Sequence, residues 1–95
     1  MIKNELASNL KHIRAVLQIS QYDLADLLHT TRARIGGWEE GRNEPSIENL
    51  IKLKNLFGYS LDTLICSKLW NQMDGDYYEY LTVELMQKIN KLLKR

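Results

Sequence analysis

The stretch SQYDLADLLHTTRARIGGWEEGRNEPS (residues 20–46) holds two short helical patterns on either side of a turn. Ser20 is a suitable N-cap for the first helix, at about 21–28, and Thr31 is a suitable N-cap for the second, at about 32–40. Two helices joined by so short a turn indicate a helix-turn-helix. Many small helical bundles contain such a pair, so the specific information lies in the wider pattern of the chain.

Two adjacent glycines, Gly36 and Gly37, lie in the middle of the second helix, where each costs about 1 kcal/mol relative to alanine. At about 100° per residue, Ile35 and Trp38 share one side of this helix, which we expect to be buried. We expect the opposite side to be open to solvent; it holds Arg32, Ala33, Gly36, Gly37 and Glu40. An exposed glycine pair would let the backbone approach a ligand closely. The alternative is that Ile35 and Trp38 anchor the helix and the pair is merely tolerated.

The rest of the chain shows helical spacing throughout. It contains one proline and no strand-length alternation of apolar and polar residues. We expect further helices at about 5–17, 47–57, 61–70 and 77–93. The expected N-caps are Asn4, Ser46 and Ser60, and the expected helix-ending glycines are Gly41 and Gly58. The sequence therefore predicts an all-α fold.

Composition limits the class of protein. The chain has 95 residues, enough for one core, and 44% of them are hydrophobic, near the globular norm. Its net charge is +1, so nucleic-acid binding would need a local patch. Cys66, the one cysteine, lies in an apolar run, and we expect it to be buried and reduced in a cytoplasmic protein. No run is long and apolar enough to span a membrane, and no cofactor or metal motif is present.

Three segments carry a resemblance to a known family: NLKHIR, SQYDLADLL and TTRARIGGWEEGRNEPSIENLIKLKNLFGYSLDTLI. Over about residues 9–65 they closely resemble the DNA-binding domain of phage repressor and Cro-like regulators, often called Xre-type. Landmarks at the family's spacing are Ser20-Gln21, Leu24-Ala25, Trp38-Glu39 and Pro45-Ser46. The resemblance implies a five-helix, lambda-repressor-like bundle whose third helix enters the DNA major groove, followed here by a C-terminal amphipathic helix. We accordingly expect a helix-turn-helix domain at 1–70 and a separate C-terminal helix, for dimerisation, at 71–95.

The start of the helix at 32–40 is expected to meet the DNA, because a recognition helix contacts bases mainly through its N-terminal residues. The fork of Arg32 matches the O6/N7 edge of guanine, and Arg34 is better placed for a phosphate. Family members usually carry polar side chains where this chain has Gly36 and Gly37, so we expect few base contacts and more dependence on DNA shape. The expected DNA-binding set is Gln21, Thr31, Arg32, Ala33, Arg34, Gly36, Gly37, Arg42 and Asn43.

The resemblance also implies the roles of residues outside this helix. Gln21, Arg42 and Asn43 match positions that contact the DNA backbone, and a helix start with free N–H groups favours a phosphate at Gln21 in any case. The alternative is that these three are polar residues on the protein surface that do not contact DNA. Arg14 and Glu39 match an ion pair between the first and third helices, which we expect to be partly buried, bidentate and structural. The alternative is that Arg14 is a solvated basic residue.

The helix at 77–93 is amphipathic and must cover its apolar stripe. One alternative is that it folds back onto the helix at 61–70, around Leu69 and Trp70. We favour a dimer contact, since aromatic residues are enriched at interfaces and a twofold protein needs a self-complementary surface. Both can hold together. The expected interface residues are Tyr78, Leu81, Leu85, Ile89 and Leu92.

The leading functional hypothesis is a sequence-specific transcriptional regulator that binds double-stranded DNA as a homodimer. Its operator would be roughly palindromic, with half-sites about one helical turn apart. Residues 20–46 hold three basic and five acidic side chains, so a single copy should bind weakly. The alternative is an antitoxin-like or other protein-interaction module with secondary DNA binding. An enzyme is not expected, because no motif joins His12 or His29 to Cys66, a carboxylate pair or a metal-ligand set.

Overall fold

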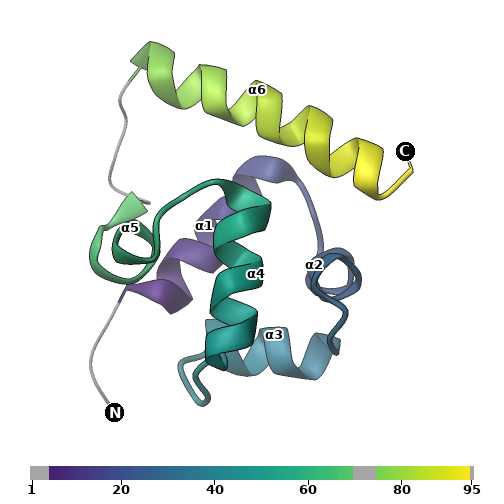
Figure 1. Ribbon diagram of the computed structural model, residues 1–95, viewed down its shortest axis with the longest axis vertical. Coiled ribbons are helices and arrows are strands. Elements are labelled where there is room, and N and C mark those ends of the chain that lie inside the picture. Colours follow the sequence, from purple (N-terminus) through teal and green to yellow (C-terminus); the bar gives the residue numbers. More distant parts are fainter. Residues whose placement is uncertain (1–4, 70–74, 95) are drawn as a thin grey trace.

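The computed structural model describes residues 5–69 and 75–94, and the side chains of its last helix from Val83 onward. All of its regular elements are helices, as the sequence predicts (Figure 1). They are α1 (Leu6–Leu17), α2 (Gln21–Leu28), α3 (Arg32–Glu39), α4 (Ile47–Phe57), α5 (Leu61–Cys66) and α6 (Gly75–Leu92). The first five enclose one core, and α6 lies across the end of the bundle opposite α3 (Figure 1). No helix of the described residues is both long and apolar enough to cross a bilayer.

Side-chain hydroxyls begin four of the helices. The oxygens of Ser20, Thr31, Ser46 and Ser60 each accept a hydrogen bond from the backbone N–H three residues later, which confirms the predicted helix starts. At Ser20 the cap is reciprocal, because the carboxylate of Asp23 accepts the Ser20 backbone N–H at 3.1 Å. Local sequence chemistry therefore sets the start of α2, α3, α4 and α5.

The helix ends are set by glycine at two positions and differ from prediction at the start of α1. Gly41 and Gly58 follow α3 and α4 with φ of +74° and +77°, the left-handed conformation that the sequence predicts. The N-cap of α1 is Glu5, which makes no side-chain capping hydrogen bond. Asn4, the predicted cap, lies outside the described residues.

The prediction that the fifth helix runs to about residue 70 is wrong, because α5 ends at Cys66. The fully buried side chain of Asn9 ends it: its Nδ2 donates to the carbonyls of Leu64 and Ser67, both at 2.7 Å, and its Oδ1 accepts the N–H of Leu69 at 3.0 Å. The groups that one more helical turn would use are thus already bonded. Cys66 is exposed at this end, so the expectation that it is buried is also wrong.

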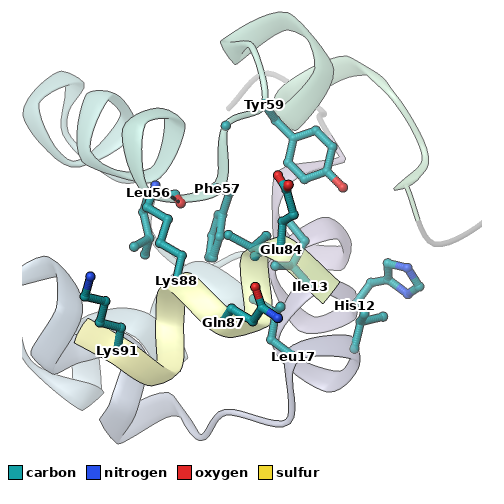
Figure 2. Close-up of a pocket in the computed structure, with 13 residues that line it drawn as sticks. His12, Ile13, Leu17, Leu56, Phe57, Tyr59, Glu84, Gln87, Lys88 and Lys91 are labelled. Carbon is teal, nitrogen blue, oxygen red and sulfur yellow. Dashed lines mark hydrogen bonds between the residues drawn. The ribbon is translucent and has the colours of Figure 1, made fainter. Parts of the chain in front are cut away.

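Two lysines donate hydrogen bonds to backbone carbonyls at the C-terminal ends of α2 and α4. Lys52 Nζ donates to the carbonyl of Leu28, the last residue of α2, at 3.1 Å. Lys88 Nζ, on α6, donates to the carbonyls of Asn55 and Leu56 in the last turn of α4, at 3.1 and 2.9 Å. Figure 2 shows Lys88 beside Leu56. A cation at this position satisfies carbonyls without an intrahelical partner and complements the helix dipole.

The described half of α6 packs on its own chain. Ile89 is 0% exposed, and Leu85 is partly buried against the same core. This helix contacts α1, and Lys88 on it reaches the end of α4. A groove of about 470 Å³ remains between α1, the end of α4 and α6 (Figure 2).

The residues predicted for a dimer contact on the last helix differ in their exposure. Ile89 is wrong as an interface residue, because it is buried in its own chain and has no surface to offer a partner. Leu85 is largely used in the same way, whereas Leu92 is 53% exposed. The side chains of Tyr78 and Leu81 lie outside the described residues.

We predict that Ile89→Ala lowers the free energy of unfolding by about 2–4 kcal/mol, since it removes a fully buried side chain from the contact between α6 and α1. The control is Leu92→Ala on the exposed face of the same helix, expected to change stability by less than about 0.5 kcal/mol. Urea denaturation followed by circular dichroism measures both. Equal effects would contradict the packing of α6 described above.

Candidate nucleic-acid interface

The turn between α2 and α3 presents the first turn of α3 to solvent. His29 ends α2 with a left-handed φ of +55°, and the N–H of Thr30 donates to the carbonyl of Ala25 at 2.9 Å. Ile35 and Trp38, 0% and 4% exposed, anchor α3 in the core, as the helical spacing predicts. The three residues before them are exposed, and they are Arg32, Ala33 and Arg34.

Arg14 and Glu39 form a bidentate ion pair between α1 and α3. Arg14 Nε and Nη2 lie 2.6 and 2.7 Å from the two carboxylate oxygens of Glu39, and the Glu39 side chain is 2% exposed. Arg14 Nη1 also donates to the carbonyl of Ile19 at 3.0 Å. The hydrogen bonds to Glu39 raise the pKa of the Arg14 guanidinium, which burial alone would lower. The charged atoms of the pair bond to each other and to the carbonyl of Ile19 inside the bundle, which supports a structural role.

Glu39 also holds Gln21, the first residue of α2. Gln21 Nε2 donates to Oε1 of Glu39 at 3.1 Å, so one buried carboxylate joins α1, α2 and α3. The other end of the Gln21 amide, Oε1, lies over Gly36, 3.7 Å from where a β-carbon would stand. Arg32 Nη1 lies 3.8 Å from the same point. The side chains of Gln21 and Arg32 therefore both lie over the glycine.

On the flank of α3 that was expected to be open, Arg32, Ala33 and Glu40 are exposed, but the expectation is wrong for Gly36 and Gly37, which are buried. Their cover is polar, and it comes from outside the core. Gln21 and Arg32 lie over Gly36, while Nδ2 of Asn43 lies 2.7 Å from the position of a β-carbon on Gly37. Because glycine has no β-carbon, these three side chains can pack closely against α3, and all three belong to the predicted DNA-binding set.

The loop after α3 folds back on the same helix. The backbone N–H groups of Arg42 and Asn43 donate to the carbonyl of Gly37 at 2.9 and 3.3 Å. The guanidinium of Arg42 is held by Glu40, with Nε 2.7 Å from Oε2, and both side chains are largely exposed. Sequence reasoning missed this pair, although the spacing of two residues across Gly41 was a visible signal. Arg42 therefore has an acidic competitor for any phosphate.

The chain is similar to several transcriptional regulators. The helix-turn-helix family model matches residues 10–64, nearly the span over which the sequence resembles Xre-type regulators. The SPbeta prophage-derived HTH-type transcriptional regulator YonR of Bacillus subtilis (strain 168) is 41% identical over 56 residues, which are 59% of this chain and 52% of that protein. The HTH-type transcriptional regulator YqaE of the same organism is 36% identical over 59 residues, 62% of this chain and 51% of that protein.

A solved structure extends the similarity beyond these segments. A transcriptional regulator from Listeria innocua has a TM-score of 0.64 and 25% sequence identity, covering 98% of this chain and 92% of that chain. The two Bacillus relatives are longer proteins, and this chain spans about half the length of each. The Listeria fold, in contrast, also covers the C-terminal helix beyond residue 64.

We predict that Glu39→Ala destabilises the protein by about 3–5 kcal/mol, because it leaves Arg14 without its partner in a partly buried position. Glu40→Ala, which removes the exposed pair with Arg42, is the matched control and should cost less than about 1 kcal/mol. Thermal and urea denaturation give both values. A loss from Glu39→Ala no larger than that of the control would show that the buried pair does not hold the bundle.

We predict that Gly36→Ala stabilises the protein by up to about 1 kcal/mol, because a methyl group meets only ordinary contacts there and alanine favours a helix. Gly37→Ala should gain less, because its methyl group must displace Asn43. Adding Asn43→Ala to Gly37→Ala should recover the difference. Purely additive effects of these two substitutions would contradict the contact between Asn43 and Gly37.

Proposed function

The chain belongs to the helix-turn-helix family of DNA-binding transcriptional regulators, and on that premise we propose that it acts as a homodimer on a roughly palindromic operator, with α3 in the major groove. The observation that carries the proposal is the exposed first turn of α3, on a helix whose later residues Ile35 and Trp38 are buried. A recognition helix reads bases with these first residues.

We assign base recognition to Arg32, whose guanidinium can bond the O6/N7 edge of guanine. Arg34 on the flank, Gln21 at the start of α2 and Arg42 in the loop contact phosphates, and Thr31 is first of all the cap of α3. The buried glycines support direct recognition of only a few bases, because Gly36 and Gly37 themselves have no side chain that could contact a base. DNA shape supplies the remaining discrimination.

Charge supports action as a dimer. Residues 20–46 hold three basic and five acidic side chains, and one of those cations, Arg42, is paired with Glu40. Phosphate neutralisation supplies most non-specific affinity, so a single copy binds weakly. Two linked copies on two half-sites regain affinity through effective concentration.

We propose the division into a DNA-binding domain at 1–70 and a C-terminal helix at 71–95. The packing of Ile89 and Lys88 supports a role for that helix in bracing α1 and the end of α4. A protein-interaction function remains the second candidate, favoured by Tyr22, which is 69% exposed on α2, and by the acidic character of residues 20–46. Co-purification of a partner with the untagged chain would favour it.

We predict that selection from a random duplex library at two salt concentrations returns a palindromic, salt-sensitive site. On that site Arg32→Ala should lose about 1–3 kcal/mol of binding and relax one position, whereas Arg42→Ala should weaken all sequences alike and lower the salt slope by about 1. Glu40→Gln, which frees Arg42, should strengthen binding to all sequences. The proposal fails if no duplex is retained in a salt-sensitive way, or if Arg32→Ala leaves binding unchanged.

A further inference from the structure

Asn43, in the loop after α3, lies directly on the backbone of that helix at Gly37. Its Nδ2 is 2.7 Å from where a β-carbon of Gly37 would stand, and its Cγ and Cβ are 3.6 and 3.7 Å from the same point. A β-carbon does not approach another heavy atom as closely as the first of these distances, so any side chain at residue 37 would push the amide out of its place. Glycine at residue 37 is therefore a condition for the observed position of Asn43.

The backbone of the loop holds Asn43 in the same place. The N–H groups of Arg42 and Asn43 both donate to the carbonyl of Gly37, at 2.9 and 3.3 Å, and Gly41 reverses the chain with a φ of +74°. One residue of α3 thus contacts both the main chain and the side chain of Asn43. A polar group that is oriented in advance loses less conformational entropy when it binds a ligand.

The amide of Asn43 is held in place and yet keeps its hydrogen-bonding groups available. Asn43 is exposed, and among the described residues neither its amide oxygen nor its amide nitrogen has a hydrogen-bond partner. Gly37 lies one turn after the exposed Ala33, so the amide lies on the same face of α3 as the first turn. Further along the helix, the carboxylate of Glu40 is paired with Arg42. Asn43 thus supplies a donor and an acceptor at a point where α3 itself has no side chain.

We propose that Asn43 is a specificity-determining residue that recognises one adenine, and that Gly37 is the positioning residue that places it. An asparagine amide accepts from N6 and donates to N7 of adenine, a pattern that no other base presents in the major groove. This assignment rests on the proposed entry of α3 into that groove, and it replaces the contact with the DNA backbone that the sequence suggests for Asn43. Gly37 follows Arg32 by five residues, about 7–8 Å along the helix, so the adenine lies about two base pairs from the guanine bound by Arg32.

Binding of the full chain to single-base-pair variants of its operator tests the proposal. The operator is the site selected from the random duplex library, and each position is changed in turn. The wild-type chain should prefer adenine at one position of each half-site by about tenfold or more, as a bidentate contact does. Asn43→Ala should abolish the preference at that position alone and leave the salt slope unchanged, because the lost group is uncharged. Arg42→Ala, in the same loop, is the matched control, and it should weaken binding to all operator variants alike and lower the slope.

Gly37→Ala tests the positioning role separately. Its methyl group takes the place of the amide, so this variant should lose the same adenine preference, and combining it with Asn43→Ala should cause no further loss. Circular dichroism verifies that the variants are folded. The inference is overturned if Asn43→Ala weakens all operator variants alike or none of them, or if Gly37→Ala keeps the adenine preference; the proposed function stands in each case. If the wild-type chain retains no duplex in a salt-sensitive way, the proposed function itself fails.

Discussion

The buried carboxylate of Glu39 fixes the arrangement on which the other features depend. It accepts hydrogen bonds from Arg14 on α1 and Gln21 on α2, while Glu39 itself belongs to α3. Its neighbour Trp38 packs in the core, so apolar contacts and the ion pair orient α3 in the same way. Moving α3 would leave a carboxylate and a guanidinium without partners, which is costly away from water. The first turn of α3 and the start of α2 are therefore held in a fixed relation.

Local chemistry made much of the fold predictable. Hydroxyl caps and left-handed glycines act within a few residues, so the starts of α2 and α4 and the end of α4 lie where the sequence predicts. The end of α5 was not predictable in this way, because Asn9 decides it from 55 to 60 positions away along the chain. Periodicity describes which face of a helix is apolar, but it does not report which distant side chain interrupts the helix.

Part of the candidate site could also be predicted from the sequence. The resemblance supplied the pair of Arg14 and Glu39, and helical geometry supplied the anchoring side of α3. Helical geometry failed at Gly36 and Gly37, because a wheel projection counts only the residues of its own helix. The cover over these glycines comes from α2, from the first residue of α3 and from the following loop. For the last helix, amphipathic periodicity is the same whether a helix packs in cis or in trans, so it could not show that Ile89 is buried within its own chain.

The ammonium group of Lys88 links two parts of the molecule that are distant in sequence. It closes the last turn of α4, and Ile89 beside it is buried against the core. If α6 detaches, the carbonyls of Asn55 and Leu56 lose this donor and that end of α4 frays. The last turn of α4 and α6 therefore form one cooperative unit, and both open with the same local free energy. The C-terminal helix contributes in this way to the rigidity of α4.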